Sequence, residues 1–241
     1  MSITDKENEL FDNWNTRYSN GLNKYLCDGI VDEQAWIKSD FRVMYLLKEV
    51  NDCGSDFDER DYLKNYSNGS DTINSIIYWQ KAIDEVRKGG HLSWSDIMTW
   101  YNDKLSVDEK TDLLKEIAVI NVKKTTGLGT VDFAKFDAYY NRKENGKYVN
   151  KDVLSEHLAL YSKFAEGKYK PNLVICGNTR WVLDDLGITD TKEWAQTFNG
   201  TNYLFKDGII YLDFCHPNAR IGRNFVYFIL RDAISEILKK Y

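Results

Sequence analysis

The chain has 241 residues, of which 32 are basic and 37 are acidic, so its formal net charge is −5. This balance excludes a polybasic arm that would hold nucleic acid by charge alone. Because 43% of the residues are hydrophobic and 14% are aromatic, the chain lies outside the composition of disordered proteins, and a packed core is expected.

Membrane insertion and export are not expected from this sequence. No run approaches the roughly 18 consecutive apolar residues of a membrane span, and the acidic start MSITDKENEL has no basic and apolar signal regions. The four cysteines are far apart and include no C-x2-C pair, which argues against a zinc ribbon or an iron–sulfur cluster. The sequence therefore predicts a cytoplasmic protein with reduced thiols, no metal and no cofactor.

The first predicted element is a helix near the N-terminus. Thr4 and Glu7 are spaced as a capping box ahead of it. Its apolar side chains recur every four residues, which is a helical spacing: Leu10, Trp14, Tyr18 and Leu22.

Four short apolar runs follow and are predicted as buried strands: residues 41–47, 117–122, 173–176 and 209–215. Helical patterns lie between and after them: residues 72–86, 106–117, 153–164 and 224–241. Ser106 and Glu109 are in capping-box register at one helix start. The alternation predicts a single α/β domain whose central four-stranded, mostly parallel sheet is flanked by helices. A helical extension over about residues 1–39 and a helical insertion over about residues 53–115 complete the predicted domain.

Polar residues follow each predicted strand. In open parallel sheets, ligands bind at the carboxyl ends of the strands, so these segments are where chemistry is expected. They read KEVND at 48–52, NVKKTTG at 121–127, GNT at 177–179 and HPNAR at 216–220.

In this order, the four segments resemble the motifs of the uracil-DNA glycosylase superfamily. The clearest match is YLDFCHPNARIGRN, in which His216, Pro217 and Asn218 stand in place of the family's His-Pro-Ser. VINVKKTTG and LVICGNT are similar to the second strand and to the third strand with its phosphate-facing turn. LKEVND departs from the first motif, which has glycine where Lys48 stands and proline where Asn51 stands. The resemblance spans about residues 40–230.

The resemblance implies a monofunctional DNA glycosylase that hydrolyses the N-glycosidic bond of a flipped-out pyrimidine and leaves an abasic site. Asn121 would bond two adjacent positions of the pyrimidine edge, because an amide offers a donor and an acceptor. His216 would stabilise the anion of the departing base. Glu49 is the first candidate for the catalytic carboxylate and Asp52 the second. The remaining predicted pocket residues are Asn51, Asn218 and Phe57, with Trp79 as an alternative to Phe57 for stacking on the base.

The same resemblance implies DNA contacts around the pocket. Ile221 would enter the gap left by the flipped base, with Arg220 as the alternative wedge. Residues from three strand ends would meet the DNA backbone: Lys123, Lys124, Gly127, Asn178, Thr179, Arg180, Arg220 and Arg223. DNA is the predicted partner, and the protein is expected to act as a monomer.

The residues after the first motif bear on the choice of base. Family members strict for uracil carry an aromatic side chain there, whereas this chain reads Asp52, Cys53, Gly54. The pocket is therefore expected to admit a 5-modified pyrimidine such as those of phage DNA, in base excision that serves DNA repair or phage defence. No lysine-linked intermediate is expected, although Lys48 is the one lysine near the motifs that is placed to form a Schiff base.

Plainer interpretations stand beside these. His216 could be a polar turn residue and Asn121 a turn cap, while His157 lies on an apolar helical stripe and is predicted to pack in the core. The residues 56–59, DFDE, are predicted to be a solvated acidic loop. Two alternatives for the whole protein are an inactive DNA- or protein-binding module of the same fold and an unrelated nucleotide-binding α/β hydrolase.

Overall fold

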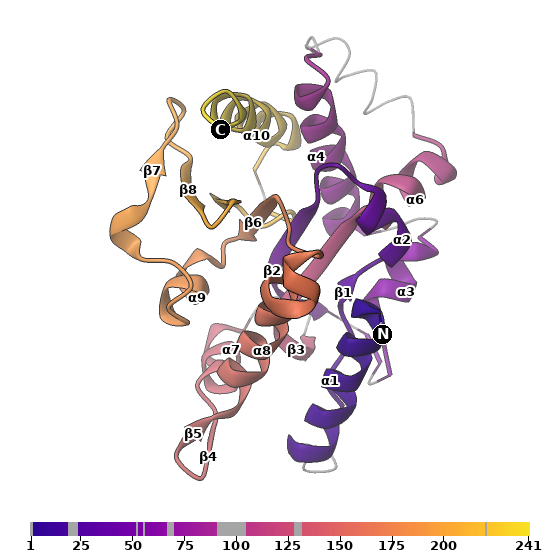
Figure 1. Cartoon of the computed structure of the whole chain (residues 1–241), viewed down its shortest axis with the longest axis vertical. Coiled ribbons are helices and arrows are strands. Elements are labelled where there is room, and N and C mark those ends of the chain that lie inside the picture. The colour runs from indigo at the N-terminus through magenta and orange to yellow at the C-terminus, as the bar shows by residue number, and fades with distance from the viewer. Residues whose placement is uncertain are drawn as a thin grey trace.

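Within the part of the chain that the structure describes, seven strands form one mixed sheet in the order β1-β3-β2-β6-β9-β8-β7 (Figure 1). This computed structural model describes residues 2–18, 24–51, 53–54, 56–66, 70–90, 105–127, 132–219 and 221–241, without the side chains of residues 165, 166, 223 and 224. The strands of the sheet are β1 (Gly29–Ile30), β2 (Val43–Asn51), β3 (Ile117–Gly127), β6 (Leu173–Gly177), β7 (Ala195–Gln196), β8 (Asn202–Lys206) and β9 (Ile209–Phe214). A separate hairpin pairs β4 (Lys143–Glu144) with β5 (Lys147–Tyr148).

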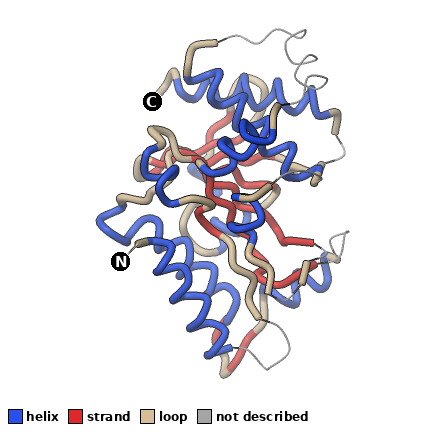
Figure 2. The backbone as a smooth tube through the Cα atoms, turned by 90° about the vertical axis from the view of Figure 1, so that its right-hand side faces the viewer, coloured by secondary structure: helices blue, strands red, loops and turns tan. Residues whose placement is uncertain are grey.

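Helices surround these strands, which run through the middle of the molecule (Figure 2). The α-helices are α1 (Ile3–Tyr18), α2 (Glu33–Lys38), α3 (Glu59–Lys64), α4 (Asp71–Arg87), α6 (Val107–Lys115), α7 (Phe133–Tyr140), α8 (Val149–Lys163), α9 (Arg180–Asp185) and α10 (Arg223–Leu238). Two short 3₁₀ turns are η1 (Phe164–Gly167) and η2 (Thr191–Glu193). None of the helices in the described residues is long and apolar enough to cross a membrane.

The predicted α/β class is confirmed, and the four predicted strands are β2, β3, β6 and β9. They are parallel neighbours in the order β3-β2-β6-β9. The predicted strand number was wrong, because antiparallel β1 extends the sheet beside β3 and antiparallel β8 and β7 extend it beside β9. β1 and β7 have two residues each, too few to show a strand period, and β8 is apolar for only three positions.

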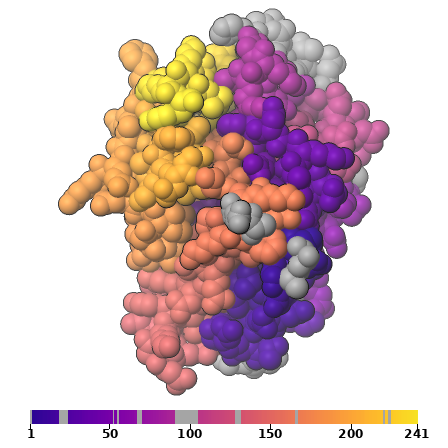
Figure 3. All heavy atoms as spheres, viewed as in Figure 1, coloured from indigo at the N-terminus to yellow at the C-terminus, as the bar shows by residue number. Residues whose placement is uncertain are grey.

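Both faces of the parallel strands are buried, which explains their unbroken apolar runs. Alternate residues of each strand point to opposite faces. In β2, Tyr45 and Leu47 pack on the face covered by α4 and α10, whereas Met44 and Leu46 pack on the face covered by α7 and α8. In the view of Figure 3, the N-terminal residues and the C-terminal third occupy opposite sides of the molecule.

The N-terminal helix begins differently from the prediction. Ser2 and Asp5 form the reciprocal cap, because the Ser2 hydroxyl accepts from the Asp5 amide and the Asp5 carboxylate accepts from the Ser2 amide. The predicted capping pair of Thr4 and Glu7 was wrong, since Glu7 is fully buried on the inner stripe of α1. The predicted capping box of Ser106 and Glu109 at the start of α6 is confirmed.

Substitution of Leu46 by alanine tests the central position of β2. Leu46 is 0% exposed, so Leu46→Ala should lower the free energy of unfolding by about 2–5 kcal/mol through lost burial and a residual cavity. The measurement is urea unfolding followed by tryptophan fluorescence. Val107→Ala, at a position 51% exposed, is the control and should change stability by less than about 0.5 kcal/mol. Equal effects of the two substitutions would contradict this description of the core.

Candidate functional site

The carboxyl ends of the four parallel strands meet at one edge of the sheet, where the order of connections reverses. From β2 the chain passes to β3 on one side, and it later fills β6 and then β9 on the other side. Such a reversal creates a crevice beyond the strand ends, between β2 and β6 here. We call the side chains that follow these strands the strand-end site: Lys48, Glu49, Asn51, Lys123, Gly127, Asn178, Thr179, His216 and Asn218.

Two close contacts bring the end of β6 and its following turn against β2, and the first also brings Gly177 against the loop after β9. A Cβ atom added to Gly177 would lie 2.7 Å from Leu47 Cδ2 and 3.4 Å from Pro217 Cδ, so only glycine fits here without displacing its neighbours. The buried Thr179 hydroxyl donates to the Leu46 carbonyl at 2.7 Å, which fastens the turn after β6 to β2. His216, which precedes Pro217, is thereby held at the crevice.

His216 is held in its neutral form. Burial, helped by the charge of Lys48, lowers the pKa of His216 to about 4. Its Nδ1 accepts from the Asn218 backbone amide at 3.1 Å, and in a neutral imidazole this leaves the proton on Nε2. His216 therefore presents a fixed N–H donor without carrying a positive charge.

Glu49 lies at the end of β2, on the face of the sheet shared with Lys123. The two side chains form an ion pair at 2.5 Å, with only 4% of Glu49 exposed. A Cβ atom at Gly127 would lie 2.4 Å from Glu49 Cδ and 2.6 Å from Asn51 Oδ1, so Gly127 gives these side chains their room. The β2–β3 register shifts between Glu49 and Asn51, an irregularity of the kind that accompanies functional sites.

Asn121 is 1% exposed, and its side chain donates to residues other than His216. Its Nδ2 donates to Asp28 Oδ2 at 3.2 Å and to Glu59 Oε2 at 2.6 Å, while its backbone amide donates to the same Asp28 oxygen at 2.7 Å. Both amide hydrogens are used, so the predicted donor-and-acceptor recognition by Asn121 does not fit this arrangement. Its Oδ1 is buried and has no hydrogen-bond partner.

Asn121 belongs to a buried ionic cluster at the β1–β3 edge of the sheet, which we define by the residues Glu7, Asp28, Glu59, Arg60, Asn121, Lys124 and His157. Lys124 pairs with Asp28 at 2.5 Å, and Arg60 pairs with Glu7 at 3.1 Å. Burial raises the pKa of Glu7 to about 7 and that of Glu59 to about 8. Burial lowers the pKa of both Lys124 and His157.

Three predicted phosphate-binding cations are already engaged by carboxylates. Lys124 is fully buried in the ionic cluster, so its predicted role in DNA binding was wrong. Lys123 is paired with Glu49. Arg180 lies between Asp213 at 3.4 Å and Asp184 at 3.6 Å, with its guanidinium over the Trp194 ring.

Other predicted residues fall in different places. Phe57 is half-buried against Tyr62, and Trp79 is a core residue between Tyr45 and Phe214. The prediction of a solvated acidic loop at 56–59 was wrong for its last residue, Glu59, which is 6% exposed in the ionic cluster. Predicted residues outside the described part are Asp52, Arg220 and the side chain of Arg223.

His157 has a mixed environment. It is 0% exposed on α8 and touches the rings of Phe11 and Trp14, which confirms the predicted core position. Its Nδ1 also lies 3.1 Å from Lys124 Nζ, so it belongs to the ionic cluster as well. Packing and polar contacts therefore coexist at this residue.

Beside the strand-end site, a groove of about 330 Å³ runs between the start of β8, the end of β9 and the first turns of α10. Asn178 borders it with a left-handed backbone, φ 62°, which asparagine tolerates better than most residues. Ile221 and Phe225 also line it and are 48% and 62% exposed. The loop after His216 thus presents apolar side chains to solvent next to the site.

Sequence reasoning missed Glu7, Asp28, Glu59 and Arg60 as members of the ionic cluster. It also missed Phe133, whose ring centre lies 4.8 Å from Lys48 Nζ. Glu7 falls at the four-residue spacing of Ile3 and Phe11 on α1, a signal that it faces inward. Asp28 and Phe133 carry no comparable signal, since Asp28 precedes the short strand β1 and Phe133 begins the short helix α7.

Comparison with known proteins finds no matching family model, no matching curated protein and no matching solved structure.

The ionic cluster predicts an unusual dependence of stability on pH. Unfolded Glu59 loses its proton near its ordinary pKa of 4.5, whereas folded Glu59 keeps it to about 8. The folded protein then binds more protons in this window, so Glu59 lowers the free energy of unfolding as pH rises, by at most about 1.4 kcal/mol per pH unit. Glu59→Gln, which stays neutral, should gain stability relative to wild type between these pH values, as measured by urea unfolding.

Glu9→Gln is the matched control, because it makes the same chemical change at an exposed position: Glu9 lies in α1 with its side chain 52% exposed. It should show no such trend. A constant difference between Glu59→Gln and wild type across the window would contradict the buried, protonated carboxyl.

Proposed function

We propose that the protein is a divergent DNA glycosylase of the uracil-DNA glycosylase type, which hydrolyses the N-glycosidic bond of a flipped-out pyrimidine. The observation that carries the proposal is the neutral N–H donor of His216, close enough to Lys48 for the lysine charge to lower its pKa, at the same strand ends as the Glu49 carboxylate. Breaking this bond leaves negative charge on the base and positive charge on the sugar. The strand-end site offers groups suited to both.

The departing base would be stabilised from the β9 side. The neutral His216 provides an N–H donor for a carbonyl oxygen, and a fixed donor stabilises a developing anion without reorganisation. The nearby ammonium of Lys48 adds positive charge. A neutral imidazole is suited to this task, because it donates a hydrogen bond without holding the charged product too tightly.

The sugar and the attacking water would be served by Glu49. Its carboxylate is nearly buried, so its field is weakly screened. Lys123 and the backbone of Gly127 fix its position, so it can orient a water or balance an oxocarbenium-like charge.

The base edge would meet Asn121 through its oxygen alone. Asn121 is on β3 and His216 follows β9, three strand spacings away, or about 14 Å between strand axes. Both amide hydrogens bind Asp28 and Glu59, and Oδ1 is buried, so Oδ1 would accept from an N–H group of the pyrimidine only after a movement of the chain that exposes it. An exposed Ile221 fits the role of the wedge that replaces the flipped base.

The 5-position of the base would remain unblocked. Of the residues after the first motif, Gly54 is exposed and Cys53 is half-buried. Neither side chain has the bulk of the aromatic residue that excludes 5-substituents. We therefore extend the proposal to 5-modified pyrimidines such as 5-hydroxymethylcytosine and its glucosylated form.

An excision assay tests the proposal. Labelled single strands and duplexes that contain uracil, 5-hydroxymethylcytosine or its glucosylated form are incubated with protein, treated with alkali and resolved by size. Wild type should cut at one of these bases, and His216→Ala should slow excision by about a hundred- to a thousandfold, the usual effect of losing one donor to an anion. Glu49→Gln should slow it by about a hundredfold or more. Because the pKa of His216 is lowered to about 4, its titration should not change excision between pH 8 and about pH 5.

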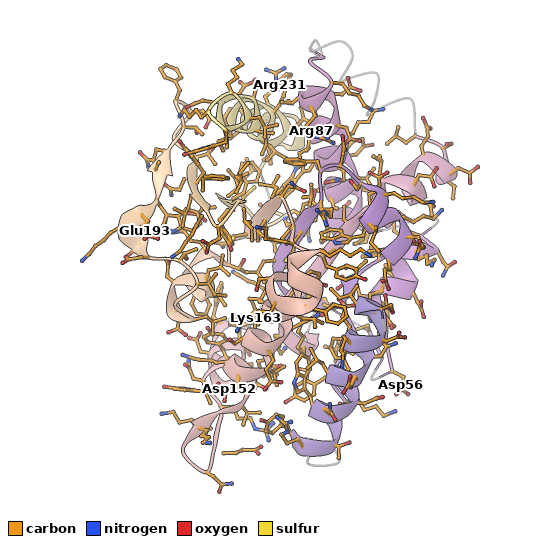
Figure 4. The ribbon with its side chains drawn as sticks, viewed as in Figure 1. Asp56, Arg87, Asp152, Lys163, Glu193 and Arg231 are labelled. Carbon is orange, nitrogen blue, oxygen red and sulfur yellow. The ribbon has the colours of Figure 1, made fainter. Side chains whose placement is uncertain are left out.

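Glu193→Gln is the control for Glu49→Gln, since Glu193 lies at the margin of the molecule beside β7 with its side chain 47% exposed (Figure 4). Its excision rate should match wild type. DNA binding without cleavage of any base would replace the proposal with a binding module. Absence of both binding and cleavage would favour an unrelated hydrolase.

Gly127→Ala tests the placement of Glu49 without removing a reactive group. The new Cβ would overlap the Glu49 carboxyl group, so the carboxylate must move. Excision should fall toward the level of Glu49→Gln while the fold, followed by circular dichroism, is retained. Gly54→Ala is the control, because a Cβ there meets no atom within 4 Å. Full activity of Gly127→Ala would mean that the position of Glu49 does not matter.

A further inference from the structure

Lys48 differs from the other buried lysines of this region. Its side chain is 8% exposed, and among the described residues it has no hydrogen bond and no ion pair. Its Nζ lies 4.8 Å from the centre of the Phe133 ring at the start of α7. Lys123 and Lys124, by contrast, are each paired with a carboxylate at 2.5 Å.

A buried ammonium without a carboxylate partner is unfavourable, because the aromatic face replaces only part of its hydration. Burial accordingly lowers the pKa of Lys48, although the negative charge of Glu49 opposes the shift. A lysine that loses its proton readily becomes an amine nucleophile, and desolvation in an apolar pocket is one of the ways in which proteins prepare Schiff-base lysines. The position of Lys48 beside His216 places this amine in the strand-end site.

We propose that Lys48 forms a Schiff base with the abasic sugar and that the protein thereby cleaves the DNA strand by β-elimination. This second activity rests on the proposed function for its substrate, the aldehyde form of the abasic site. It does not replace water as the nucleophile in base excision.

The steps balance without another reactant. The ammonium of Lys48 gives a proton to the departing base anion and becomes a free amine. The amine nitrogen attacks C1′ of the ring-opened sugar, and loss of one water leaves a C=N bond. Loss of a C2′ proton to water then forms a C2′–C3′ double bond and breaks the C3′–O bond, so the 3′ phosphate leaves with its electron pair. Water finally hydrolyses the C=N bond and restores Lys48.

The test begins from an abasic site, so that it does not require base excision. Oligonucleotides with a preformed abasic site are incubated with the full-length protein, without alkali, in the presence or absence of borohydride. Borohydride reduces the C=N bond to a stable amine, and the protein–DNA complex then survives denaturing electrophoresis. Wild type should form the complex, and peptide mass spectrometry should find the adduct on Lys48. Without borohydride, the strand should be cut.

Lys48→Arg and Lys48→Met should reduce trapping by about a hundredfold or more, because neither offers the amine nucleophile. Lys135→Arg is the control, since Lys135 lies in α7 with its side chain 69% exposed, and it should trap as wild type does. An adduct on any other amine, or no adduct, overturns the proposal, and the mass spectrum decides this on wild type even if a variant fails to fold. Base release without trapping would leave the proposed function intact. Trapping without base release would leave the lyase and reject the glycosylase.

Discussion

The proposed chemistry depends on the burial of Lys48 beside His216. In water, both a lysine and a histidine would be strongly hydrated, and the charge of one would hardly change the pKa of the other. At the strand-end site, burial and the Lys48 charge together keep His216 neutral, and burial also weakens the hold of Lys48 on its proton. An imidazole that donates without charge and a cation that is poorly solvated are both ready to meet an anion.

The order of the strands in the sheet creates this environment. The connections reverse at β2, so β6 and its following turn pack against β2, and Gly177 at the end of β6 contacts the loop after β9. Gly177 allows Pro217 and Leu47 to approach closely, and Thr179 ties the same turn to the Leu46 carbonyl. These contacts use buried backbone and small side chains, so the loop that carries His216 is anchored by the core of the fold.

Much of the fold could be predicted from sequence because it depends on local periodicity. The four parallel strands are apolar on both faces and the long helices repeat every three to four residues, which are patterns visible in one dimension. The two-residue edge strands could not be predicted, since they are too short to show a strand period. The ionic cluster could not be predicted either, because a carboxyl group such as that of Asp28 contacts partners far along the chain. The strand-end residues were identified by position, but whether Lys123 faces phosphate or a carboxylate is decided by tertiary contacts.

Asn121 belongs to the ionic cluster and lies on β3, two residues before Lys123 of the strand-end site. Asp28 and Glu59 take the two hydrogens of its amide, so the orientation of its oxygen is set by the cluster before any ligand arrives. The protonated Glu59 limits the number of negative charges packed around Lys124, but its proton is released toward pH 8. His216 is neutral throughout that range. Rising pH should therefore first ionise the Glu59 carboxyl, which then accepts more strongly from the Asn121 amide and adds negative charge beside Asp28. The anion-stabilising side of the site stays unchanged, so the proposed recognition of the base and the proposed stabilisation of its charge respond to pH through different groups.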